Sequence, residues 1–329
     1  MTTAGLPAAE LHLHIEGTLE PELALTLARR NGITLSHDTA DELRRRYAFE
    51  DLQSFLDIYY ETMAVLREPQ DFTDLADAYF ERAAADGVVR AELFFDPQAH
   101  LRRGVPFDVV IDGLWTAVQS SEARFGVSSG LIMCFLRDLG PAAAMETLDA
   151  ASGHVDRLLG VGLDSSEVGF PPGDFAEVFE AARAAGLHTV AHAGEEGPPS
   201  YIWDALDVLG VERVDHGVRC LEDDALVARL VADRIPLTVC PLSNLQLCVV
   251  PTMADHNLPR MLDAGLVVTV NSDDPAYFGG YLGANIAAVR DTFGLDDAAL
   301  RLLAANSFEA SFVDDDERAR LLARLEATP

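Results

Sequence analysis

The sequence predicts an α/β fold, a closed (β/α)8 TIM barrel with a helical insertion after its first strand. Short apolar runs recur along the chain, and amphipathic helical stretches separate them. Strands that alternate with helices indicate βαβ units and a parallel sheet. The later units repeat every 25 to 30 residues or so, roughly the length that one helix and two loops of a barrel unit need. We expect residues 1–329 to form one domain.

The expected strands are short runs in which branched and aromatic side chains are frequent. They cover residues 9–14, 88–96, 129–136, 160–165, 188–193, 213–217, 235–240 and 266–272. Between them, segments 174–186 and 224–234 carry apolar residues at helical spacing. Gly186 stands where a glycine commonly ends a helix.

The interval between the first two strands is too long for a single helix. We expect an insertion over about residues 20–87, with helices at 21–32, 39–47, 52–66 and 71–87. In a barrel the segment after a strand lies at the catalytic face, so part of this insertion should lie over it. The insertion's aromatic side chains are Phe49, Phe55, Tyr59 and Tyr60. We expect most of them in the core and one or two in a pocket.

The composition argues against several classes of function. The chain has 24 basic and 54 acidic residues, a formal charge of -30, which disfavours nucleic acid and anionic membranes as partners. Every basic residue is arginine, so Schiff-base, phosphate-loop and metal-bridging lysines are absent. The cysteines form no CxxC pair, and we find no signal peptide or membrane-spanning run. We expect a cytoplasmic protein; its oligomeric state stays open, a homo-oligomer being possible.

Titratable residues lie at the ends of several of the expected strands. They are His12 and His14 of the first, His192, Glu195 and Glu196 at the end of the fifth, Asp215 and His216 of the sixth, and Asp273 and Asp274 at the end of the eighth. Alternate residues of a strand share a face, so the two histidines of the first strand can hold one metal ion between them. Because the strand ends of a barrel meet at one face, the other residues should join them there.

This pattern predicts a metal centre with hydrolytic chemistry. Imidazole nitrogens with one carboxylate suit zinc, so His12, His14, His192 and Asp273 are the expected ligands of one ion, although iron or manganese also accept such ligands. A bridging Glu167 would allow a second metal, but we favour one. Zinc makes its bound water acidic, and that water needs orientation and proton transfer. His216 and the aspartates are candidates for orientation, and Glu195 for the acid.

The motifs HLHIEGTLEPE, HAGEEGP, DHG and NSDDPAYFGGY resemble the adenosine/adenine deaminase branch of the amidohydrolase superfamily. The resemblance covers nearly the whole chain. It implies a zinc barrel that releases ammonia from C6 of a purine, with the four ligands named above. It further implies that Glu195 protonates N1, that His216 helps to deprotonate and hold the attacking hydroxide, and that Asp274 contacts N7. The cytidine-type signature of H-x-E with P-C-x-x-C is absent.

The substrate is expected to be a free base. Adenosine-type members have aspartate where this chain has Glu16, and the longer side chain could fill the ribose space or bond a ring nitrogen. Segments such as ELFFDPQAH look like those of adenine-specific members. The segment 164–169 differs from the adenosine type, so no ring contact is assigned to it. Adenosine, an N6-substituted adenine or another 6-aminopurine remain alternative substrates, and a non-catalytic purine-binding barrel is a remote alternative.

Overall fold

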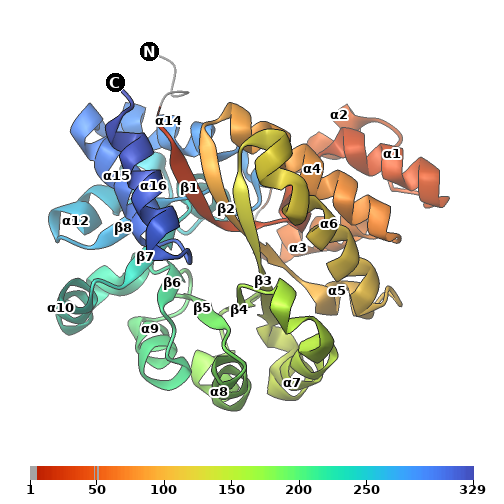
Figure 1. Ribbon diagram of the computed structural model, residues 1–329, viewed down its shortest axis with the longest axis horizontal. Coiled ribbons are helices and arrows are strands. Elements are labelled where there is room, and N and C mark those ends of the chain that lie inside the picture. Colours follow the sequence, from red (N-terminus) through yellow and green to blue (C-terminus); the bar gives the residue numbers. More distant parts are fainter. Residues whose placement is uncertain (1–5, 48, 50–51) are drawn as a thin grey trace.

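The computed structural model describes residues 6–47, 49 and 52–329, and its centre is a parallel sheet of eight strands (Figure 1). The strands are β1 Ala8–His14, β2 Val88–Phe95, β3 Ser128–Leu136, β4 Gly160–Asp164, β5 His188–Ala193, β6 Arg213–His216, β7 Pro236–Val239 and β8 Val267–Val270. Neighbours in sequence are neighbours in the sheet throughout. All eight lie where the apolar runs predict them, which confirms the (β/α)8 barrel.

The barrel closes between β8 and β1 by a short bridge and by side chains. The N–H of His14 donates to the carbonyl of Asp273 at 3.0 Å, and the N–H of Asp273 donates to the carbonyl of His12 at 3.1 Å. Further down β1, the N–H of Leu11 donates to Oδ1 of Asn271 at 2.9 Å. Side chains thus satisfy buried backbone groups that a regular ladder would otherwise pair.

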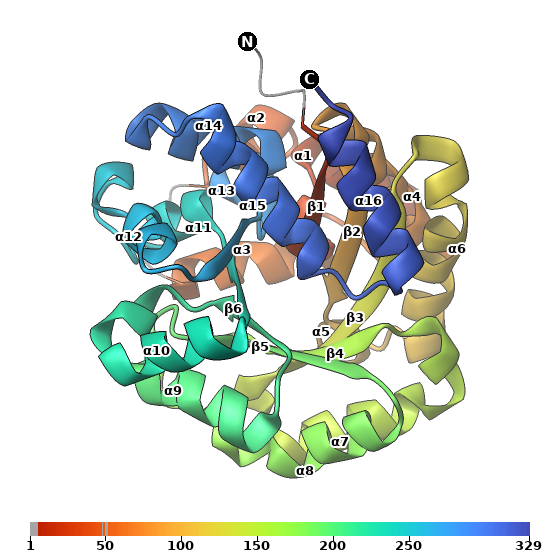
Figure 2. The same cartoon turned by 60° about the vertical axis from the view of Figure 1, so that its left-hand side comes forward.

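Helices surround the strands (Figure 2). After β2 they are α5 Pro97–Leu101, α6 Phe107–Phe125, α7 Gly140–Ala150, α8 Ala176–Ala184, α9 Pro199–Asp204, α10 Asp224–Asp233, α11 Pro241–Gln246, α12 Leu258–Asp263, α13 Pro275–Phe278, α14 Leu282–Phe293, α15 Asp297–Glu309 and α16 Asp315–Glu326. The predicted end of α8 is confirmed, because Gly186 has φ +84° and the N–H of Leu187 bonds back to Ala182.

Four helices lie between β1 and β2, as the length of that interval predicts. They are α1 Pro21–Asn31, α2 Ala40–Arg44, α3 Leu52–Met63 and α4 Pro69–Ala85. Phe55 and Tyr59 of α3 are buried and make edge-to-face contacts with Tyr277 of the segment after β8. Helix α3 therefore lies over the carboxyl ends of the strands.

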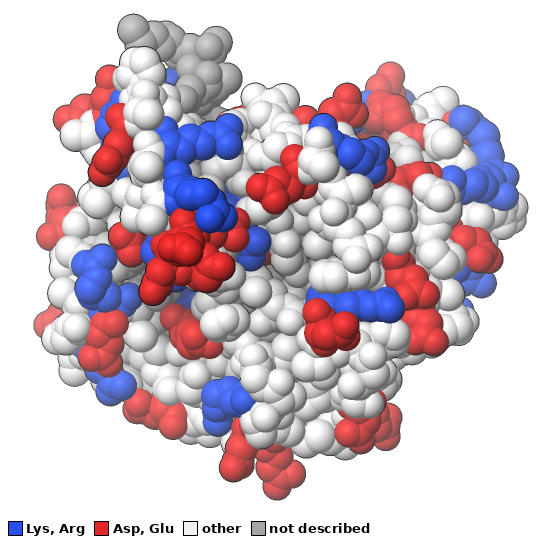
Figure 3. Space-filling model, viewed as in Figure 1, with Lys and Arg blue, Asp and Glu red and all other residues white. Residues whose placement is uncertain are grey.

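The acidic surface carries arginine side chains between its carboxylates, as the face drawn in Figure 3 shows. Arg124 lies 2.7 Å from Asp77, and Arg157 lies 2.6 Å from Asp112. Exposed pairs of this kind add little stability each. Within the described part of the chain, every helix is too short or too polar to cross a membrane.

Candidate metal centre and catalytic site

The ends of β1, β5 and β8 bring together the four residues expected as metal ligands. His12, His14, His192 and Asp273 are buried, and each offers one ligand atom within 4.8 Å of the others. His14 Nε2 lies 3.2 Å from His192 Nε2. Asp273 Oδ1 lies 3.4 Å from His12 Nε2 and 3.6 Å from His14 Nε2.

The hydrogen bonds of these imidazoles leave lone pairs pointing at one another. His12 Nδ1 lies 3.2 Å from the carbonyl oxygen of Thr238, and His192 Nδ1 lies 3.1 Å from that of Leu163. A carbonyl oxygen only accepts, so each neutral ring keeps its proton on Nδ1 and a lone pair on Nε2. His12 Nε2 has no hydrogen-bond partner among the described residues. Converging lone pairs beside a carboxylate are stable when a cation lies between them, and three nitrogens with one oxygen fit zinc.

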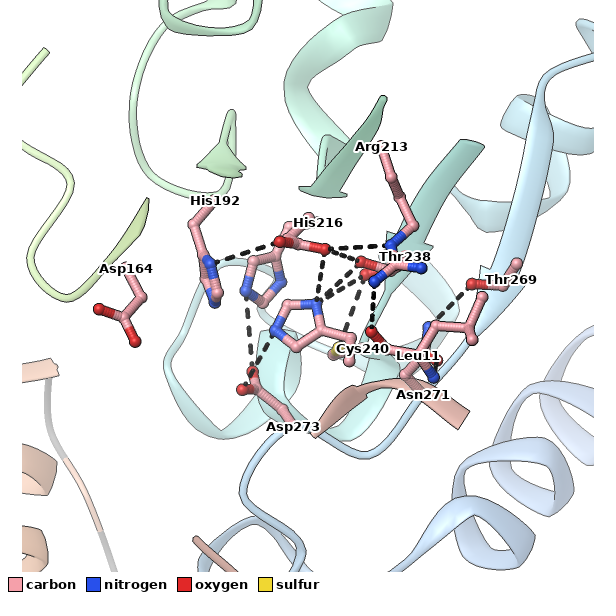
Figure 4. A network of polar contacts seen from close by, with 12 residues as sticks. Leu11, Asp164, His192, Arg213, His216, Thr238, Cys240, Thr269, Asn271 and Asp273 are labelled. Atoms are coloured by element: carbon pink, nitrogen blue, oxygen red, sulfur yellow. Dashed lines mark hydrogen bonds and ion pairs between the residues drawn. The ribbon is translucent and has the colours of Figure 1, made fainter. Parts of the chain in front are cut away.

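A buried polar layer orients the ligands from behind (Figure 4). Thr238 donates its hydroxyl proton to Asp215 at 2.7 Å, and the Asp215 carboxylate lies 3.9 Å from His12 Nδ1 and 3.8 Å from His192 Nδ1. Arg213 Nε lies 3.9 Å from the same carboxylate. Asp215, which the sequence places among the strand-end residues, therefore lies behind the candidate ligands, where outer partners of metal-binding histidines are commonly found.

Two site residues have a left-handed backbone. Asp273 has φ +66° and His216 has φ +61°. Such a conformation costs a non-glycine residue about 1–3 kcal/mol and persists where the surrounding structure fixes it. At Asp273 the fixing partners are the two backbone bonds to β1 that close the barrel.

Glu195 lies in the loop after β5 and its carboxyl group faces the cavity. Its Oε2 lies 3.5 Å from His216 Nε2, and its Oε1 is buried with no partner among the described residues. Burial, together with the negative charges of Asp273 and Glu167, raises the pKa of Glu195 well above its ordinary value. The environment thus favours the protonated form, which can donate to a bound molecule.

Glu167 fixes the loop that carries Glu195. Its carboxylate accepts four consecutive backbone N–H groups, those of residues 194, 195, 196 and 197, at 2.6, 3.0, 2.8 and 2.8 Å. A Cβ on Gly197 would lie 2.6 Å from Glu167 Oε1, so only glycine permits this approach. Both oxygens of Glu167 are occupied by the backbone, which leaves it unsuited to the bridging-ligand alternative.

A chain of hydrogen bonds sets the tautomer of His216. The N–H of Leu258 donates to His256 Nδ1 at 3.0 Å, so the neutral His256 ring carries its proton on Nε2 and faces Asn244 Oδ1 at 3.2 Å. The Asn244 amide then donates to His216 Nδ1 at 3.4 Å. Burial, reinforced by the neighbouring imidazole of His12, lowers the pKa of His216 to about 3. His216 is therefore neutral, with an N–H at Nε2 that can hold an oxygen; its expected part in deprotonation stays a prediction.

Asp274 also has an unused carboxyl oxygen. Its Oδ1 is buried without a partner among the described residues. Burial and the adjacent charge of Asp273 raise the pKa of Asp274 well above its ordinary value. A Cβ on Gly17 would lie 1.9 Å from Asp274 Oδ1, so glycine in the turn after β1 makes room for this side chain.

Glu16 is buried but lies outside the residues that line the cavity. Its Oε1 lies 2.7 Å from His100 Nε2 and accepts the backbone N–H of Asp96 at 3.2 Å. The expected contact between Glu16 and a substrate therefore stays a prediction, and the structure favours an indirect effect through Asp96.

The cavity wall includes residues that the sequence did not single out. Asp96 follows β2 and Asp164 ends β4, and both line the cavity beside the candidate ligands. From α3, Phe55, Tyr59 and Tyr60 line it, three aromatic side chains where one or two were expected. The overlooked signal is a carboxylate directly after an apolar strand.

The chain matches the adenosine deaminase family over residues 7–328 and belongs to it. It is thus a hydrolase that acts on C–N bonds. A relative named adenine deaminase, from Streptomyces coelicolor, is 65% identical over 98% of this chain and 95% of its own length.

Solved structures agree with this assignment. The crystal structure of adenine deaminase from Arthrobacter aurescens has a TM-score of 0.96 at 54% identity and covers 98% of each chain. An amidohydrolase from Burkholderia ambifaria with bound Zn has a TM-score of 0.90 at 29% identity and covers 98% of this chain and 90% of its own.

Proposed function

We propose that the protein converts adenine and water into hypoxanthine and ammonia, with one zinc ion per chain, and that it serves purine salvage in the cytoplasm. The site observation that carries this proposal is a buried, proton-donating Glu195 beside a cluster of three imidazoles and one carboxylate. The relatives named adenine deaminase, 55% to 65% identical to this chain, support adenine as the substrate.

The residues divide the reaction between them. His12, His14, His192 and Asp273 hold the zinc, which when bound supplies an activated water. Glu195 gives its proton to N1, so C6 becomes electron-poor and accepts the water oxygen. The N–H of His216 Nε2 stabilises that oxygen, and Asp274 holds N7. Of the two protons of the water, one returns to the Glu195 carboxylate and the other goes to the exocyclic nitrogen. The bond between C6 and this nitrogen then breaks, and it leaves as ammonia while C6 keeps the oxygen.

Ammonia release by the zinc-loaded protein tests this proposal on adenine, adenosine and N6-methyladenine. We expect adenine to be preferred over adenosine by at least about tenfold in kcat/KM, because a clashing or missing group of this size is worth about 1–3 kcal/mol and tenfold corresponds to 1.4 kcal/mol. Comparable turnover of adenosine would move the protein to nucleosides, and a preference for N6-methyladenine to substituted bases. Release from none of the three would leave another 6-aminopurine as the substrate or the non-catalytic, purine-binding alternative.

A further inference from the structure

Asp96 has an unused carboxyl oxygen in the cavity wall, although its side chain is also hydrogen-bonded to that of Asp164. Its side chain is nine-tenths or more buried, and Oδ1 has no hydrogen-bond partner among the described residues. Asp96 directly precedes helix α5, a position where aspartate usually caps the helix. Here the carboxylate makes no capping hydrogen bond and lines the cavity instead. Burying a carboxyl oxygen without a partner is costly, so Oδ1 is poised for a ligand that donates a hydrogen bond.

Asp274 repeats this arrangement on the other side of β1. Asp274 follows β8 and directly precedes Pro275, just as Asp96 directly precedes Pro97. Its side chain also makes no capping hydrogen bond. Strands β2 and β8 are the two neighbours of β1 in the barrel. The two unused carboxylates therefore flank the carboxyl end of β1.

The order of these groups around the barrel matches the order of nitrogens around a purine. If the proposed function holds, C6 faces the ligand cluster, Glu195 after β5 meets N1, and Asp274 after β8 meets N7. From N1, passing away from C6, the remaining nitrogens are N3 and then N9, followed by N7. Around the barrel from β5, the strand ends follow one another in the order β4, β3, β2, β1 and β8. Asp96 after β2 thus falls on the N9 side, next to the N7 contact.

We propose that Asp96 determines the choice of a free base by accepting the hydrogen bond of its N9–H. A nucleoside has a sugar on N9 and no hydrogen there, so it would leave Oδ1 of Asp96 buried and unpaired. Discrimination against an analogue that lacks a required donor is stronger than discrimination by size. The backbone N–H of Asp96 is held by Glu16 Oε1, which His100 binds in turn. Glu16 is accordingly a positioning residue that acts through Asp96.

The kinetic experiment compares adenine with 9-methyladenine, which keeps the ring and carries a methyl group in place of the N9–H. We expect the unmodified protein to prefer adenine by about 10–100-fold in kcat/KM, the range for leaving a buried acceptor without its partner. Asp96→Asn should lower kcat/KM for adenine by a similar factor, mainly through KM, and bring the two substrates within about threefold. The matched control is Asp138→Asn, an exposed carboxylate beyond β3, which should keep the preference.

Binding of purine and 9-methylpurine, which carry no 6-amino group, separates this inference from the proposed function. By calorimetry, the unmodified protein should bind purine about 10–100-fold more tightly than 9-methylpurine. For Asp96→Asn the two dissociation constants should agree within about threefold. If adenine releases no ammonia but this binding difference is found, the proposed function fails and the role of Asp96 stands. If the unmodified protein binds both alike or does not bind purine, or if Asp96→Asn keeps the preference, the role of Asp96 is overturned. The comparison of ligands on the unmodified protein applies even if the variant fails to fold.

Discussion

Replacing Glu167 by glutamine tests whether the loop after β5 must be held for Glu195 to act. The carboxylate accepts one N–H at Oε1 and three at Oε2. The less costly orientation of a glutamine places its oxygen at the three N–H groups and its NH2 group against the N–H of Gly194, 2.6 Å away in the native contact. One hydrogen bond to a charged group is then lost and a buried donor is left unpaired, at a cost of about 1.5–3 kcal/mol.

We expect Glu167→Gln to lower the free energy of unfolding by about that amount and kcat by about 10–100-fold, since small displacements of a catalytic group have effects of this size. Zinc content should stay the same, because the predicted ligand His192 lies on β5 itself, before the loop. Urea denaturation, metal analysis and ammonia release measure the three quantities. Glu177→Gln, an exposed glutamate on α8, is the matched control. A folded, metal-loaded Glu167→Gln protein with native kcat would refute the reasoning.

Three further predictions concern the metal and the proton transfers. Purified protein should hold about one zinc per chain by mass spectrometry, and His192→Ala should lose both metal and activity; two ions per chain at full activity would contradict the site. Glu195→Gln should keep zinc while kcat falls by about 10²–10⁴; a change of less than about threefold would move the acid role to another residue. Only the protonated form of Glu195 can donate, so the activity of the unmodified protein should fall as the pH rises above the raised pKa of Glu195. Asn244→Asp removes the donor to His216 Nδ1, so we expect kcat to fall by about 10²–10⁴ with zinc retained; Asn257→Asp is the matched control, and an equal loss there would indicate a general effect.

The sequence predicts the barrel and the ligand cluster because both leave periodic or unusual patterns. Eight apolar runs at regular spacing fix the strands, and the spacing of His12 and His14 fixes their common face. The closure between β8 and β1 leaves no such pattern, because Asn271 and Ser307 use side chains to satisfy backbone groups of β1. The periodicity of the sequence therefore predicts the strands but does not predict how β8 pairs with β1.

Carboxylates are harder to interpret than histidines, because an aspartate or glutamate in a loop has many structural uses. Glu167 reads in the sequence as a conceivable bridging ligand, but its partners come from a loop after a different strand. Asp96 occupies the capping position of a helix that begins with proline, and only its missing capping bond distinguishes it. Glu167 and Asp96 differ in whether backbone N–H groups donate to their carboxyl oxygens, and that depends on tertiary contacts.

The backbone around Asp273 links barrel closure to the metal site. Its N–H and carbonyl join β8 to β1, and its left-handed conformation is held by those two bonds. Its carboxylate meets the imidazoles of His12 and His14, which lie on the strand that it closes. A cation bound there would therefore hold together, through side chains, the two strands that the backbone joins by few bonds. The place where the barrel has its weakest strand pairing is thus the place where the candidate ligands converge, so a metal bound there would reinforce the barrel closure.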